Sequence, residues 1–125
     1  MAQQDLDVAY QSDGYALTAV TEDPLERLRN RFRSQFLSSK KSDGRGSLFY
    51  SQLQQGLIRT NSDIISLFYL SAADILLYLR QLQMDAYITR ASLTDFEIED
   101  SRHLTLWFTL YSSEGTIDDT VEVAL

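Results

Sequence analysis

The chain has 125 residues, of which 44% are hydrophobic and 23% are charged, and its formal net charge is −7. This length and composition are ordinary for one soluble globular domain that buries a core of its own. The chain contains no cysteine, which excludes disulfides and thiolate sites. No run of eighteen apolar residues and no basic-then-apolar leader is present, so neither a membrane span nor classical secretion is predicted.

The charges are distributed unevenly along the chain. Residues 1–26 carry six acids and no base, and residues 91–125 carry eight acids against Arg102. Between them, residues 27–45 carry seven bases against Asp43 alone. Such blocks suit a protein that docks between other charged molecules. They equally suit a basic segment that lies against acidic segments of its own chain, and the sequence leaves both interpretations open.

Two short strands are the first predicted elements, within residues 5–20. Leu6, Val8 and Tyr10 alternate with polar residues, and the turn residues 12–14 follow before Tyr15 resumes the pattern. We therefore divide the chain into an N-terminal strand pair or arm, residues 1–22, and a single α+β domain, residues 23–125.

A helix is predicted to begin after Asp23. This residue can cap it, Pro24 suits the first helical position, and Glu26 follows the cap by three residues as in a capping box. One apolar stripe runs along the helix, formed by Leu25, Leu28, Phe32 and Phe36. Residues 38–46 then form a predicted loop, and residues 47–60 hold a small apolar cluster and a short turn or helix.

Residues 62–83 form the main helical region. Its first half is apolar nearly all round, which predicts burial or cover by a partner. Ser71, with Asp74 three residues later, can cap a new helix. We therefore expect a break near residues 70–72 and two helices at an angle.

Three strands are predicted to complete the chain. Residues 86–99 change the parity of their apolar positions, which predicts a β-bulge near Thr94 and Asp95. Residues 103–111 alternate strictly, and the second side of this strand is also β-branched or aromatic, which predicts cover on both sides and a central place in the sheet. The fold class is α+β, with a C-terminal three-stranded antiparallel meander, helices packed on one face, and a short N-terminal strand pair.

The last strand, residues 117–125, is a candidate sheet edge. Its apolar residues occupy one side and its polar residues the other, except that Asp119 breaks the apolar parity. Exposed edges are normally blunted by charge. Here Asp118, Asp119 and Glu122 would either do this or select a basic partner strand.

Catalysis has little support in the sequence. His103 is the only histidine, no nucleophile motif is present, and the glycines of residues 43–46 do not match a phosphate-binding loop. We predict no enzyme activity, no cofactor and no metal site. Nucleic-acid binding by the basic segment 27–45 is the alternative function, although Phe32 and Phe36 fall on the apolar stripe and the chain as a whole is acidic.

The order of these parts resembles the small baseplate proteins of contractile phage tails, the wedge and sheath-initiator family sometimes labelled lysozyme-like. The similar features are the acidic strand pair, the arginine-rich helix around residues 28–32, and the glycine-led segment 46–50 with Gly56 following. Family members often carry Glu-Pro-Arg before the first closing strand. Here that junction is Gln83, Met84, Asp85 and Ala86, so the wedge contact made there is not carried over.

The resemblance implies a structural protein of the virion, in the tail baseplate, assembled in the host cytoplasm. It implies six copies in a ring, with tail sheath, tail tube and baseplate wedge proteins as partners and no membrane. The terminal strand would seed sheath assembly by β-augmentation. The implied strand contacts are Ile117, Asp118, Asp119, Val121, Glu122, Val123 and Leu125, and the implied tube or wedge contacts are Arg27, Arg29, Arg31 and Arg33. Deletion of residues 117–125 is then expected to leave a soluble domain and to stop sheath polymerisation.

Overall fold

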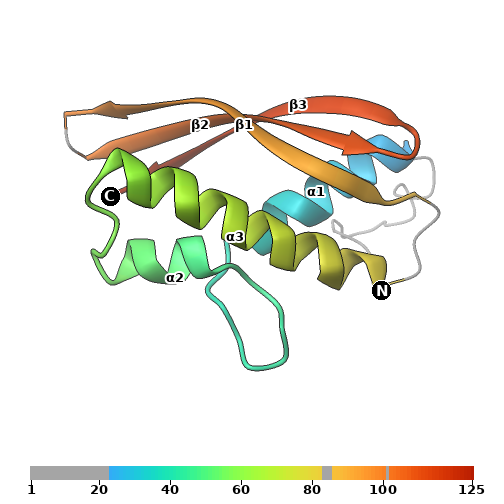
Figure 1. The fold of residues 1–125 in the computed structure, drawn as a ribbon, viewed down its shortest axis with the longest axis horizontal. Coiled ribbons are helices and arrows are strands. Elements are labelled where there is room, and N and C mark those ends of the chain that lie inside the picture. Colours follow the sequence, from blue (N-terminus) through green and yellow to red (C-terminus); the bar gives the residue numbers. More distant parts are fainter. Residues whose placement is uncertain (1–22, 83–85, 101) are drawn as a thin grey trace, which may run out of the picture.

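Two layers follow from the capped helices and the alternating strands of the chain. The computed structural model describes residues 23–82, 86–100 and 102–125. Helices α1 (Pro24–Phe36), α2 (Leu48–Gln54) and α3 (Asn61–Arg80) precede strands β1 (Ile88–Glu99), β2 (His103–Ser112) and β3 (Gly115–Ala124). The helices lie on one face of the sheet (Figure 1). The predicted α+β class with a C-terminal meander is confirmed, whereas the predicted strands within residues 5–20 lie outside the described residues.

Helix α1 begins at the residue that its sequence predicts, although Glu26 pairs with Arg29 and no capping box with Asp23 is seen. Pro24 occupies the first turn, and the Asp23 carboxylate accepts a hydrogen bond from the Leu25 N–H at 3.2 Å. This bond satisfies one of the amides that a helix start leaves without a partner. The buried stripe of α1 consists of Leu28, Phe32 and Phe36.

An aromatic cluster joins the helices to the sheet. Phe36 lies at its centre, with ring centroids 4.9 to 6.4 Å from those of four other phenylalanines. These partners come from α1, α2, α3 and β2, and they are Phe32, Phe49, Phe68 and Phe108. All five side chains are buried, so this cluster fixes the helical layer against the central strand.

The predicted break at residues 70–72 is wrong, because α3 is one continuous helix of 20 residues. Ser71 is fully buried, and its hydroxyl accepts a hydrogen bond from the Phe49 N–H at 2.9 Å. The hydroxyl therefore satisfies an amide in the first turn of α2 and does not cap a new helix. The cap of α3 is Thr60, whose side chain and that of Asp63 form a capping box.

The sheet has the strand order β1-β2-β3, antiparallel throughout, so the predicted central place of β2 is confirmed. The register shifts between Leu93 and Asp95, which confirms the predicted bulge. The expected cover on both sides of β2 is wrong among the described residues, because all three helices pack on one face. On the outer face Trp107 and its neighbours along β2 are half-buried or exposed, and side chains of β1 and β3 lie directly across from them.

Candidate functional site

Strand β3 is an outer strand of the described sheet, and its register shows which backbone groups face outward. Residues 113–114 join β2 to β3, and Ser112 pairs with Gly115. The closing pair of a two-residue hairpin exchanges ladder hydrogen bonds, and such pairs alternate along an antiparallel ladder. The N–H and C=O groups of the even-numbered residues of β3 therefore point away from β2. These residues are Thr116, Asp118, Thr120, Glu122 and Ala124.

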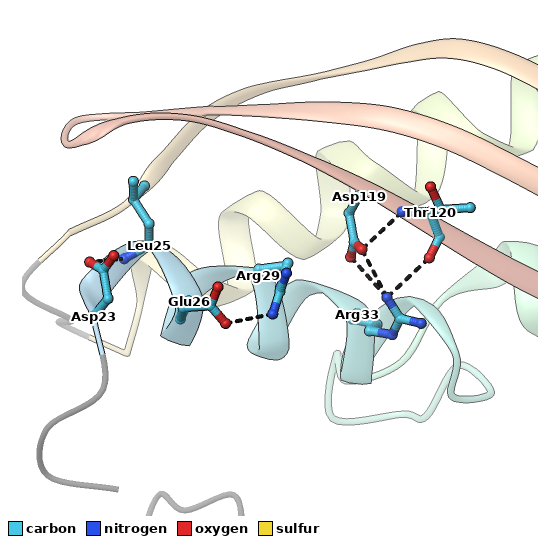
Figure 2. A network of polar contacts seen from close by, with 7 residues as sticks. All are labelled: Asp23, Leu25, Glu26, Arg29, Arg33, Asp119 and Thr120. Carbon is cyan, nitrogen blue, oxygen red and sulfur yellow. Dashed lines mark hydrogen bonds and ion pairs between the residues drawn. The ribbon is translucent and has the colours of Figure 1, made fainter.

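The middle of this edge is closed by a network that we call the edge lock, formed by Arg33, Asp119 and Thr120. Arg33 Nη1 donates to the two Asp119 carboxylate oxygens at 2.9 and 3.1 Å and to the Thr120 carbonyl at 3.0 Å. The Thr120 N–H donates to Asp119 Oδ1 at 2.8 Å. Figure 2 shows the Arg33 side chain reaching from α1 to both residues of β3. Both outward groups of Thr120 thus have partners within the chain.

The lock depends on the parity break at Asp119. Asp119 pairs with Phe108 across the ladder and so points toward the helices, like Ile117 and Val121. Its side chain is only 9% exposed, against 42% for Arg33. A charge that points inward on an outer strand is one of the devices by which proteins prevent edge-to-edge pairing.

Beyond the lock, the other half of the edge borders a hollow of about 290 Å³. We call it the edge hollow. Its walls come from the end of α1, from α2 and from β3, and they consist of Leu37, Tyr50, Leu53, Gln54, Glu122, Val123 and Ala124. Two of these residues, Glu122 and Ala124, also present outward backbone groups. Open backbone groups thus lie directly beside a partly apolar depression.

The structure divides the residues predicted to contact a partner strand. Val121 is fully buried in the chain's own core, which leaves no surface of its side chain for a partner, whereas Val123 is mostly buried but also lines the edge hollow. Ile117 packs partly against the same core. Asp119 was also predicted to contact a partner strand, but its side chain faces the helices and belongs to the edge lock. The contact residues that remain exposed are Asp118, Glu122 and Leu125.

The four arginines predicted to contact tube or wedge proteins are half-buried on α1, and each has an interaction within the chain. Arg29 pairs with Glu26, and Arg33 belongs to the edge lock. Arg27 and Arg31 also have partners. Burial lowers the pKa of the Arg31 guanidinium below its usual value. For Arg29 and Arg33 the intramolecular interpretation of the basic block therefore applies.

The loop of residues 38–46 follows the same intramolecular pattern. Lys40 pairs with Asp74 of α3 at 3.5 Å, and Arg45 pairs with Asp43 at 2.8 Å. Backbone N–H bonds, chiefly that of Arg45, hold the pKa of the Asp43 carboxyl below its usual value. Acidic side chains of the chain thus neutralise several cations of the basic block.

The outer face of the sheet carries most of the remaining acids. By register, five carboxylates share this face with Trp107, and they are Asp95, Glu97, Glu99, Asp118 and Glu122. His103 lies 3.6 Å from Glu122, and the Arg90 guanidinium lies 3.9 Å from the centroid of the Tyr111 ring. No three His, Asp or Glu side chains of the described residues converge as metal ligands would.

The edge lock and the edge hollow were not predicted from the sequence, and only the parity break at Asp119 pointed toward them. Arg33, the cation that pairs with Asp119, lies 86 residues earlier in the chain. Comparisons with protein-family models, with curated proteins and with solved structures gave no match.

Proposed function

We propose that this chain is a structural assembly protein that takes up an extended segment of a partner along the second half of the β3 edge. The observation that carries the proposal is the juxtaposition of outward backbone groups at Glu122 and Ala124 with the edge hollow. An added strand gains affinity from main-chain hydrogen bonds and specificity from pockets for alternate side chains. The partner segment is therefore short and places one apolar side chain between Leu37, Tyr50 and Leu53.

The resemblance to baseplate proteins supplies the biological setting of this proposal. In that setting the chain belongs to the virion tail baseplate, six copies ring the tail tube, and the added strand comes from the first ring of sheath subunits. The exposed acid of this half of the edge, Glu122, favours a basic partner strand. The α1 arginines are proposed to meet tube or wedge proteins through the parts of their half-buried side chains that remain accessible.

The test requires point substitutions. Deletion of residues 117–125 would remove Val121 and Val123 from the core, so we now expect it to destabilise the domain instead of leaving it soluble. Ala124→Pro instead removes one outward N–H, which an outer strand tolerates. We expect this variant to keep its fold by circular dichroism and to lose sheath polymerisation on purified tube and baseplate components.

Asp118→Pro is the matched control for Ala124→Pro. It removes an outward N–H of the same strand on the far side of the edge lock, away from the edge hollow and beside a different depression, which Asp118 lines together with residues of β1 and β2. We expect sheath polymerisation to persist with this variant. Normal polymerisation with folded Ala124→Pro protein would refute the proposal, and loss of polymerisation with both variants would refute the assignment to the second half of the edge.

The alternative of nucleic-acid binding by residues 27–45 gains no support from the contacts of this segment. Phe32 and Phe36 are fully buried and cannot stack on bases. Arg29, Arg33 and Arg45 are engaged by carboxylates of the same chain. We therefore do not propose it.

A further inference from the structure

The exposed side of α3 is unusually apolar for a helix that already covers a sheet. Leu77 and Leu70 are 63% and 57% exposed, and Ile65 and Tyr69 are each 43% exposed. Together with the exposed Ala73 these residues form a stripe that we call the α3 outer face. Large apolar side chains gathered on one face mark an interaction surface, whereas isolated ones do not.

The length of α3 gives this face an unusual extent. Among the described residues, α3 is the one helix long and apolar enough to cross a bilayer, and only 33% of its most apolar window is buried. The core helix of a soluble protein can be equally long and apolar, but such a helix is mostly buried. Here the described residues of the sheet and of the other helices cover one side of α3 and leave the other side exposed.

We propose that the α3 outer face binds the same face of a second copy of this chain, with the two helices antiparallel. The two-fold axis passes at the level of Ser71, midway between Ile65 and Leu77. Leu77 of each copy then lies against Ile65 of the other. The exposed part of the Tyr69 ring, whose hydroxyl accepts a hydrogen bond from the Leu93 N–H of β1 at 3.0 Å, lies against the small Ala73. Large residues that face small ones allow two helix surfaces to interdigitate.

Charge complementarity favours the antiparallel orientation over the parallel one. Asp63 lies in the first turn of α3 and Arg80 in the last. Hydrogen bonds from the Arg59 and Thr60 N–H groups hold the pKa of the Asp63 carboxyl below its usual value, so this carboxylate is ionised near neutral pH. Antiparallel pairing brings each Arg80 toward the first turn of the partner's α3, whereas parallel pairing would place like charges side by side.

The proposed dimer is compatible with strand addition at β3. Helix α3 packs beneath β1, whereas α1 packs beneath β3, so the α3 outer face lies on the β1 side of the molecule (Figure 1). One helix face covers less than the roughly 800 Å² per partner of a standard interface, so we expect a reversible dimer of moderate affinity. The inference does not rest on the proposed function.

Sedimentation equilibrium of the full chain over a concentration series tests the proposal. We expect a monomer–dimer equilibrium for the natural sequence and a monomer at every concentration for the double variant Leu70→Lys/Leu77→Lys. Both substituted residues are exposed, and lysine is a good helix former, so the fold is retained. The matched control is Ile98→Lys, which removes an exposed apolar side chain of β1 and should leave dimerisation unchanged.

Cysteine cross-linking tests the orientation, because the chain has no cysteine of its own. Ile65 and Leu77 lie about 18 Å apart along the helix axis. Disulfides need Cα atoms within about 7 Å. In the antiparallel dimer a mixture of Ile65→Cys and Leu77→Cys chains therefore forms disulfides under mild oxidation, and neither variant does so alone.

Three outcomes would overturn the proposal. The first is a natural sequence that stays monomeric at high concentration, and the second is a Leu70→Lys/Leu77→Lys variant that still dimerises. The third is cross-linking of Leu77→Cys with itself, which would mean a parallel pair. Co-sedimentation of the monomer with phosphatidylcholine vesicles, lost in Leu70→Lys/Leu77→Lys, would instead assign the α3 outer face to a bilayer surface.

Discussion

At the residue scale, the contact between Arg33 and Asp119 closes the middle of the β3 edge. Replacement of Arg33 by alanine leaves the nearly buried Asp119 carboxylate without its cation. A buried polar group that loses its partner costs about 1–3 kcal/mol. Because Arg33 is 42% exposed, water replaces part of the lost interaction, and we expect the free energy of unfolding to fall by about 1–2 kcal/mol in urea titration.

The double variant Arg33→Ala/Asp119→Val is the control for this prediction. Valine continues the apolar parity of Ile117 and Val121 on the helix-facing side of β3. We expect the double variant to regain most of the stability lost by Arg33→Ala, because no buried charge is left unpaired. A double variant less stable than Arg33→Ala would show that the lock is a net source of stability and not chiefly a device against edge pairing.

At the scale of elements, the loop of residues 38–46 depends on one glycine where its two ends meet, a place that we call the neck of the loop. Gly46 has a φ of +84°, and a Cβ there would overlap the Ser39 carbonyl oxygen. Two backbone hydrogen bonds close the neck, from Ser47 N–H to Ser38 O and from Lys41 N–H to Arg45 O, both at 2.8 Å. An alanine at position 46 must push these segments apart.

Gly44 provides the matched comparison, since it also has a positive φ but nothing lies within 4 Å of a Cβ placed there. Gly44→Ala should cost only the conformational penalty of about 1–2 kcal/mol. Gly46→Ala should cost about 2 kcal/mol more, because the two neck hydrogen bonds are worth about 1 kcal/mol each. Thermal unfolding of both variants checks this order, and equal losses would contradict the role of the neck.

The elements that could be predicted from the sequence are those set by neighbours along the chain. The cap at Asp23, the bulge near Thr94 and Asp95, and the alternation of β2 are local patterns, and the structure has all three. The predicted break in α3 failed because Ser71 bonds to Phe49, 22 residues away. Nothing in the residues around Ser71 indicates that partner.

The candidate site was harder to predict for the same physical reason. The edge lock joins α1 to β3, and the edge hollow joins α1, α2 and β3. Alternation correctly placed Val121 and Val123 on one side of the strand. It could not show that this side is the chain's own core, in which Val121 is fully buried, nor that Val123 would also line the edge hollow.

At the scale of the whole molecule, the lock determines how much of the β3 edge another strand can use. The outward N–H and C=O groups of Thr120 are bonded to Asp119 and Arg33, so they cannot bond to another strand. Thr120 therefore separates the open groups of Glu122 and Ala124 from those of Thr116 and Asp118. Arg33→Ala/Asp119→Val removes this barrier and joins the two halves into one continuous run of open backbone groups. A long row of unpaired N–H and C=O groups with no inward-pointing charge is a template for pairing with another chain.

We therefore expect Arg33→Ala/Asp119→Val to self-associate through β3, with a rise in light scattering and in β-sheet signal as concentration increases. The measurement is made in the Leu70→Lys/Leu77→Lys background, so that contacts through the α3 outer face do not contribute. Adding Asp118→Pro and Ala124→Pro to this chain should abolish the association, because each removes an outward N–H that the pairing needs. If the unlocked chain stays monomeric, the lock does not restrain the edge, and the limit on strand addition must come from the acids beside it.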